Sequence, residues 1–234
     1  MSTFVLIHGG GDTGWAWHLV EAELRARGHD VVAPDLPGDD ESKTLTDYAD
    51  AVVEAVGGKR DLVVVGHSFG AFTAPLVADR LPVDVLVLLA GMIPSPGESP
   101  DEWWANTGYP NAVAEQAKRD GGLTGNADPH VSFYHDVPRK LAEEAMTKER
   151  AHPSTAATAA PWPLDAWPDV PTRLVLCSED RFFPPDFFRR LALERLGIVP
   201  DEVEGSHCVA LSHPKELADM LTRYAAAASA ASPQ

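Results

Sequence analysis

The sequence predicts an α/β protein in which a mostly parallel sheet carries helices on both faces and is interrupted by one long insertion. Short, continuous apolar runs alternate with segments that place apolar residues at helical spacing. This pattern is typical of strands that are buried on both faces. The alternation stops near residue 92 and resumes near residue 171. A length of 234 residues suits one such domain with an insertion.

Four strands and three helices are expected before the insertion. Each predicted strand is short and ends at glycine, proline or histidine, and two of the helices stop at Gly28 and Gly57. The predicted strands are residues 3–8, 30–38, 61–67 and 83–91. The predicted helices are residues 16–28, 44–58 and 69–81.

The alternation after the insertion predicts two further strands and two further helices. The strands are residues 172–177 and 198–205, and the helices are residues 184–197 and 213–227. The small-residue tail, residues 227–234, is expected to fray. We therefore assign residues 1–91 and 171–234 to the core domain.

Residues 92–170 are assigned to a cap insertion after the fourth strand. This segment is rich in aromatic residues and proline. One helix is expected in it, at residues 138–151. Residues 152–171 contain five prolines and are interpreted as a linker that returns to the core.

The composition narrows the classes of function. With 19 basic and 35 acidic residues, the chain has a net charge of −16. It has no basic cluster, which argues against nucleic acid and anionic membranes as partners. No signal peptide or membrane span is predicted, so a cytoplasmic location is expected. Cys177 and Cys208 are expected to be buried free thiols, and the sequence leaves a homodimer open.

Three chemically complementary residues follow three of the predicted strands. Ser68 follows the third strand, Asp180 the fifth and His207 the sixth. Ligands of parallel sheets bind beyond the carboxyl ends of the strands, so these side chains are expected to meet. Serine, acid and histidine in this chain order are typical of the α/β-hydrolase fold, the fold that we predict. A histidine can activate a serine hydroxyl, and a carboxylate can orient the histidine.

The surroundings of Ser68 match a nucleophile elbow, Gly66-His67-Ser68-Phe69-Gly70. Small residues on both sides of the serine let the strand and the following helix pass closely. Tetrahedral intermediates also need hydrogen-bond donors. The backbone amides of Phe69 and of Gly10, in the loop "HGGG", are the predicted oxyanion hole.

Other acids and histidines near these positions are alternatives. Glu179 and Asp186 could replace Asp180, although Asp186 fits the first turn of the next helix. His213 is expected to be a surface or capping residue. His8 and His67 are expected to bond to loop backbone. The sequence shows no metal-binding cluster and no nucleotide-binding motif, so no metal and no cofactor is expected.

The segments "FVLIHGGGDTGWAWHLVEAEL", "DLPG", "GHSFGA" and "EGSHCVALSHPKEL" resemble the plant methylesterase and hydroxynitrile lyase branch of the α/β hydrolases and its bacterial esterase relatives. The resemblance implies the same triad, Ser68, Asp180 and His207, the same oxyanion amides, and a cap over the site. Ser206 departs from the family, in which many members carry aspartate. The lyases of the family carry lysine and threonine where this chain has Cys208 and Gly9.

These observations predict a serine hydrolase that cleaves a small, apolar or aromatic carboxylic ester through an acyl-enzyme. Trp103 and Trp104, in the cap, are candidate substrate-binding residues, although aromatic residues also pack in cores. Two alternatives stay open. One is a non-hydrolytic enzyme on the same triad, either a lyase or a natural-product tailoring enzyme. The other is a ligand-binding protein with an inert hydrolase fold.

Overall fold

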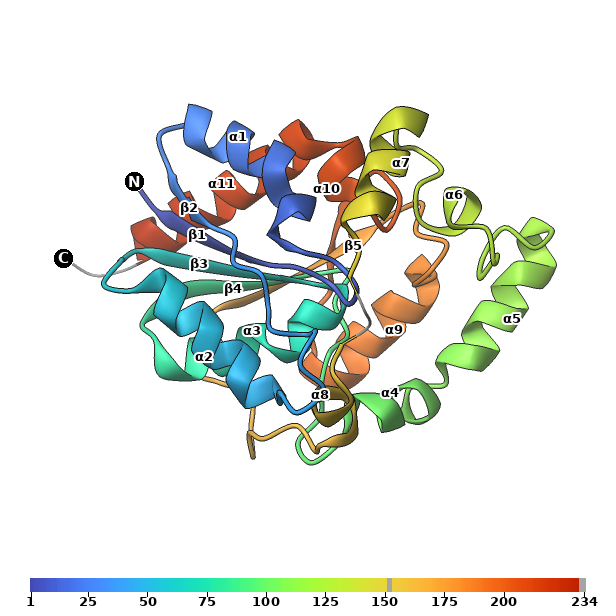
Figure 1. The fold of residues 1–234 in the computed structure, drawn as a ribbon, viewed down its shortest axis with the longest axis horizontal. Coiled ribbons are helices and arrows are strands. Elements are labelled where there is room, and N and C mark those ends of the chain that lie inside the picture. The colour runs from blue at the N-terminus through green and yellow to red at the C-terminus, as the bar shows by residue number, and fades with distance from the viewer. Residues whose placement is uncertain (151–152, 232–234) are drawn as a thin grey trace.

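A computed structural model of the chain describes residues 1–150 and 153–231. It contains one sheet of six parallel strands in the order β2-β1-β3-β4-β5-β6 (Figure 1). The predicted α/β-hydrolase fold is confirmed by this sheet. The strands are β1 (Thr3–Ile7), β2 (Asp30–Val32), β3 (Leu62–His67), β4 (Val83–Leu89), β5 (Thr172–Cys177) and β6 (Asp201–Val203).

Every residue of β1 and β3 is buried, as the continuous apolar runs predicted. The two strands pair in parallel from Thr3 with Leu62 to Ile7 with Gly66. The chain winds outward in opposite directions from this pair, to β2 on one side and to β4 on the other. A parallel sheet binds its ligands at such a switch point, so the loops after β1 and β3 are the expected position of a site.

Helices cover both faces of the sheet (Figure 1). One face carries α1 (His18–Ala26), α10 (Val209–Ser212) and α11 (Pro214–Ala231). The other carries α2 (Leu45–Val56), α3 (Ala74–Arg80) and α9 (Pro185–Leu196). Two 3₁₀ segments precede helices, η1 (Gly14–Trp17) and η2 (Ser68–Phe72). The tail predicted to fray is helical to Ala231, and residues 232–234 lie outside the described part.

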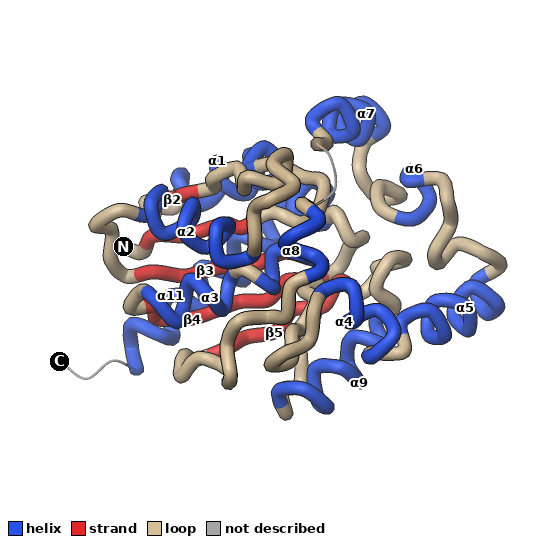
Figure 2. Tube along the Cα trace, turned by 60° about the horizontal axis from the view of Figure 1, so that its bottom comes forward, coloured by secondary structure: helices blue, strands red, loops and turns tan. Residues whose placement is uncertain are grey.

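The segment between β4 and β5 is more helical than predicted. It contains α4 (Pro100–Asn106), α5 (Tyr109–Asp120), α6 (Pro129–Ser132), α7 (Arg139–Lys148) and α8 (Thr155–Ala159). The predicted number of helices in this segment, one at residues 138–151, was therefore too low. The helix α8 lies within residues 152–171, which were interpreted as a linker. Figure 2 shows α4–α7 beyond the ends of the strands. The 92–170 boundaries of a separate cap remain a prediction.

The insertion is fastened to the core by buried polar contacts. The indole N–H of Trp162 donates to the Phe72 carbonyl at 3.0 Å. The Tyr48 hydroxyl and the Ser154 hydroxyl lie 2.7 Å apart. Because buried polar groups without partners are costly, these bonds hold the insertion in one position over the carboxyl ends of the strands.

The turn from β3 into η2 is a crowded backbone junction near those ends. A methyl group on Gly70 would lie 2.6 Å from the His8 carbonyl oxygen and 2.7 Å from that of Ile7. A methyl group on Gly66 would lie 2.8 Å from Ala74 Cβ. The two glycines therefore let η2 lie directly against the end of β1.

We predict that Gly70→Ala lowers the free energy of unfolding by about 1–3 kcal/mol, because the new methyl group must displace backbone carbonyl groups. Gly58→Ala is the matched control, since a methyl group there would have no neighbour within 4 Å. Urea denaturation of both variants checks the prediction. Equal stability of the two variants would contradict the proposed crowding.

Candidate active site

Ser68 lies on the sharp turn between β3 and η2. Its φ angle is 52°, a left-handed conformation that a serine adopts at an energetic cost. Its carbonyl accepts a hydrogen bond from the Met92 amide at 3.0 Å. The side chain is buried, with 8% of the residue exposed. The strained backbone thus holds the hydroxyl at the carboxyl edge of the sheet.

One chain of hydrogen bonds joins the three residues that follow β3, β5 and β6. His207 Nδ1 lies 2.7 Å from Asp180 Oδ2, and His207 Nε2 lies 3.0 Å from Ser68 Oγ. With the imidazole proton on Nδ1, the ring donates to the carboxylate and accepts from the serine hydroxyl. All three residues are buried. This geometry can activate a hydroxyl nucleophile.

Asp180 is held rigidly in this arrangement. Its Oδ1 accepts hydrogen bonds from the amides of Phe182 and Phe183, both at 2.8 Å, which leaves Oδ2 for the imidazole. The two alternative acids do not contact His207. Asp186 lies in the first turn of α9 and pairs with Arg189, and Glu179 is exposed.

His67 and His8 bond to loop backbone, the arrangement that the sequence suggested. His67 Nε2 donates to the His207 carbonyl at 2.9 Å. His8 Nδ1 donates to the Gly9 carbonyl at 2.8 Å, and its Nε2 accepts from the Leu36 amide at 3.0 Å. Burial lowers the pKa of both rings, and for His67 burial and then the nearby His207 lower it to about 3. Both histidines are therefore neutral near pH 7.

His213 is a partly exposed residue between α10 and α11. Its Nε2 lies 3.5 Å from Asp136 Oδ2. The same carboxylate accepts a hydrogen bond from the Ser206 amide at 2.8 Å. Asp136 thus connects the insertion to the loop that carries His207.

The backbones of Gly10 and Phe69 lie next to each other beside Ser68. A methyl group on Gly10 would lie 3.4 Å from Phe69 Cβ. Within the described part of the chain, neither amide has a hydrogen-bond acceptor. Both residues line the cavity that contains Ser68. Two free amides at this position could bind a developing oxyanion.

A cavity of about 550 Å³ opens over Ser68 and His207. One part of its wall is apolar and includes Met92, Trp104, Phe133 and Phe182. Trp103 does not line the cavity, although it was a candidate substrate-binding residue. It is 1% exposed, and its indole N–H donates to the Ile93 carbonyl at 2.9 Å, so its position is that of a core residue.

The remaining wall is polar and contains residues that the sequence analysis missed. Asp12, Tyr134, Glu149 and Arg150 line it, together with Cys208. Cys208 is partly exposed, whereas Cys177 is buried, so the expectation of two buried thiols was wrong for Cys208. Asp12 directly follows the loop "HGGG", a signal that was available in the sequence. Tyr134 and Glu149 lie in the insertion and carried no such signal.

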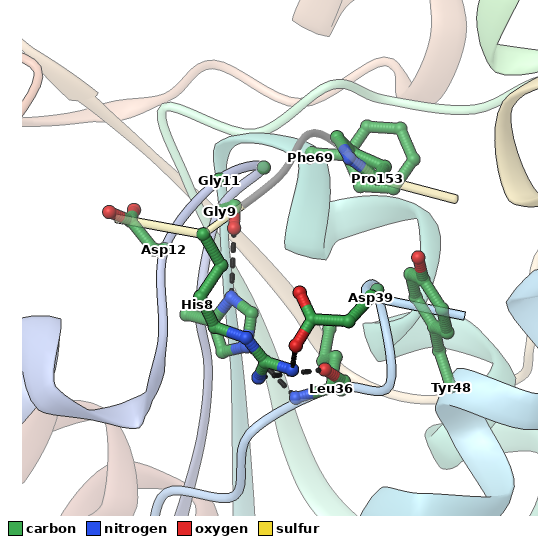
Figure 3. A pocket seen from close by; sticks show the side chains of 12 residues that line it. His8, Gly9, Gly11, Asp12, Leu36, Asp39, Tyr48, Phe69 and Pro153 are labelled. Atoms are coloured by element: carbon green, nitrogen blue, oxygen red, sulfur yellow. Dashed lines mark hydrogen bonds and ion pairs between the residues drawn. The ribbon is translucent and has the colours of Figure 1, made fainter. Parts of the chain in front are cut away.

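The glycine loop also borders a smaller pocket (Figure 3). His8, Asp39 and Tyr48 contribute to its wall. In Figure 3 the Asp12 carboxyl points away from the side chains of His8 and Asp39. Within residues 1–150 and 153–231, no cluster of histidine, cysteine and acidic side chains could hold a metal ion. Within the same residues, no helix is long and apolar enough to cross a membrane.

Comparisons with known proteins agree with this architecture. The family described as "Alpha/beta hydrolase family" matches residues 4–220. Methylesterase 7 of Arabidopsis thaliana is 29% identical over 95% of this chain and 95% of its own length. Norfluorocurarine synthase 1 of Strychnos nux-vomica is 24% identical over 95% of this chain and 94% of its own length. The resemblance to plant methylesterases is thereby confirmed.

A solved structure shows the same fold. The pyrethroid hydrolase of Sphingobium faniae superposes with a TM-score of 0.75 over 97% of this chain and 98% of its own chain, at 22% identity. This likeness concerns the arrangement of the backbone.

The buried, neutral His67 makes stability depend on pH. Its pKa is about 3 in the folded chain and about 6.5 in the unfolded chain. As the pH falls from about 6.5 to 3, the unfolded chain binds a proton that the folded chain excludes. We therefore predict that the unfolding free energy falls by up to about 1.4 kcal/mol per pH unit in this window.

His67→Gln removes this titration and retains a donor for the His207 carbonyl. We expect a shallower decline in stability for this variant when urea denaturation is repeated between about pH 7 and pH 5. His8, whose pKa is also lowered, contributes equally in both proteins. Parallel curves for the two proteins would exclude His67 as a source of the pH dependence.

Proposed function

Because this chain belongs to the alpha/beta hydrolase family, we propose that it hydrolyses a small carboxylic ester through an acyl-enzyme on Ser68. Its family and its methylesterase and esterase relatives identify it as a hydrolase. The observation that carries the finer proposal is the hydrogen-bond chain from Asp180 through His207 to Ser68, at 2.7 and 3.0 Å.

In the proposed reaction, His207 Nε2 takes the Ser68 proton as Oγ attacks the ester carbonyl. Asp180 holds the imidazole in the required tautomer and stabilises the imidazolium. The amides of Gly10 and Phe69 bind the oxyanion of the tetrahedral intermediate. The imidazolium then protonates the leaving alcohol, and a water molecule releases the acid by the same steps.

The cavity supports a substrate with an apolar or aromatic part. Its volume of about 550 Å³ is in the range of small-molecule sites. Trp104, Phe133 and Phe182 lie on one wall. They can pack against an aromatic or aliphatic group, which leaves the carbonyl near Ser68.

Three alternatives predict different experimental results. A tailoring enzyme on the same triad is favoured by one observation, the similarity to a protein named norfluorocurarine synthase. A cyanohydrin lyase is disfavoured because Gly9 and Cys208 supply neither the hydroxyl nor the cation that the lyases of the resembled branch use. An inert binding protein would not be labelled at Ser68 by a fluorophosphonate.

We predict that Ser68→Ala lowers the turnover of an activated aryl ester by about 10³-fold or more, because the triad acts as a unit. A fluorophosphonate should label the wild-type protein and not the variant. Circular dichroism of the variant checks that it is folded. A variant that retains a large part of the wild-type rate would exclude Ser68 as the nucleophile.

The same preparations test the lyase alternative. We expect that mandelonitrile releases no cyanide above the buffer rate with either protein. Rapid cyanide release that depends on Ser68 would replace ester hydrolysis by lyase activity as the proposed function.

We further predict that Asp180→Asn lowers kcat/KM for the same ester by about 10³–10⁴-fold, because the amide no longer stabilises the imidazolium or fixes its tautomer. Asp186→Asn makes the same chemical change at a side chain that is 81% exposed, and near-normal kinetics are expected. The opposite ranking would assign the acid to Asp186.

A further inference from the structure

Two hydrogen-bond acceptors lie beside the nucleophile and have no donor within the described chain. A methyl group on Gly9 would lie 3.2 Å from Ser68 Cβ, 3.3 Å from Asp12 Oδ2 and 3.4 Å from His67 Nδ1. Gly9 is therefore surrounded by the nucleophile, a carboxylate and a ring nitrogen. All four residues line the cavity.

His67 presents an acceptor at this point. Its Nε2 is committed as a donor to the His207 carbonyl, so Nδ1 of the neutral ring carries a lone pair. The residue is 8% exposed. A nearly buried acceptor of this kind needs a donor from a ligand or from water.

The Asp12 carboxylate is the second acceptor. Within the described chain, no hydrogen bond and no ion pair engages its oxygens. The Arg150 guanidinium, which lines the same cavity, binds Asp39 and the Leu36 carbonyl instead. Burial and then Glu149 raise the pKa of Asp12 to about 6, while His207 opposes the shift. The carboxyl is therefore mostly ionised above neutral pH.

The surrounding wall adds to the negative charge. Glu149 lines the same cavity and accepts a hydrogen bond from the Tyr134 hydroxyl at 2.9 Å. A ligand group that donates hydrogen bonds and carries positive charge can bond to both acceptors and is attracted by the negative charge of this wall. A hydroxyl group can form the hydrogen bonds but gains no charge attraction.

We propose that Asp12 and His67 Nδ1 form an ammonium subsite beside Ser68, which selects esters whose acyl group carries a protonated amine close to the carbonyl. Asp12 supplies the charge and His67 an additional acceptor. The apolar wall of Trp104, Phe133 and Phe182 then receives the alcohol part. This inference rests on the proposed ester hydrolysis and specifies its substrate class.

The kinetic test compares two esters of the same size. Benzyl 3-aminopropanoate carries an ammonium group where benzyl butyrate carries a methyl group. We expect kcat/KM of the wild-type protein for the amino ester to exceed that for the butyrate by about tenfold or more, the ratio given by about 1.4 kcal/mol of charge attraction. Benzyl 3-hydroxypropanoate should fall between them.

Asp12→Asn retains the size of the side chain and removes its charge. The ratio of kcat/KM for the amino ester to kcat/KM for benzyl butyrate should fall to about one in this variant, whatever the change in the rate that the two esters share. Asp186→Asn, with the same change in net charge outside the cavity, should retain the wild-type preference. A wild-type protein that hydrolyses both esters at equal rates would overturn the subsite and leave the proposed function standing.

Binding separates the two proposals when turnover fails. Isothermal titration of the Ser68→Ala protein compares N-benzyl-3-aminopropanamide with N-benzylbutanamide, which are inert to the variant. Tighter binding of the ammonium compound that is lost in Ser68→Ala/Asp12→Asn supports the subsite. If the wild-type protein hydrolyses no ester, this result rejects the proposed ester hydrolysis and leaves the subsite standing. Equal binding of the two amides would reject the subsite.

Discussion

The contact between η2 and the end of β1 is the constraint on which the other features of the site depend. Gly70 has no side chain, so its Cα packs against the carbonyl groups of Ile7 and His8. This contact sets the distance between the turn at Ser68 and the glycine loop that follows β1. The amides of Gly10 and Phe69 are brought together by the same contact. Ser68 keeps its strained φ of 52° because the packed elements on both sides of the turn prevent its backbone from relaxing.

The loop that carries His207 is fixed by polar contacts from several directions. His67 donates to its carbonyl, Asp180 accepts from its ring, and Asp136 accepts from the amide of Ser206. The Ser206 hydroxyl accepts from the Cys208 amide at 3.2 Å. Ser206, the departure from the resembled family, therefore closes a turn inside the loop. An imidazole held in this way loses little entropy when it moves a proton between serine and substrate.

The sequence was sufficient to predict the core because burial on two faces leaves a direct pattern. Continuous apolar strands predicted the parallel sheet, and residues after the strands predicted which side chains meet at its carboxyl edge. The predicted strands at residues 30–38 and 198–205 were longer than the observed β2 and β6. In an edge strand only the residues that pair with the neighbour become strand, and the flanking residues of both predicted strands do not pair.

The insertion was predicted poorly for physical reasons. The first helix, α4, carried a readable signal, a capping box in which Ser99 and Glu102 bond to each other's backbone amides. By contrast, α5 contains no fully buried residue, and only partly buried side chains such as Tyr109 and Ala112 pack against the core. Side chains from the insertion reach the cavity through tertiary packing, which no local pattern encodes. Trp103 and Trp104 illustrate this, because adjacent tryptophans point to the core and to the cavity respectively.

The Asp12 carboxylate has two opposite electrostatic effects on the proposed transition state, and the charge of the substrate decides their balance. A carboxylate near His207 stabilises the imidazolium that forms when Ser68 loses its proton. The same carboxylate repels the oxyanion that forms on the carbonyl at the same moment. For a neutral ester these two effects oppose each other. An ammonium group on the acyl chain would lie between the carboxylate and the oxyanion and attract both, so its binding energy would increase as the transition state develops. Interactions that strengthen in this way raise kcat rather than lower KM alone. An acidic residue beside a hydrolytic nucleophile therefore brings opposing effects for neutral esters and an advantage for cationic ones.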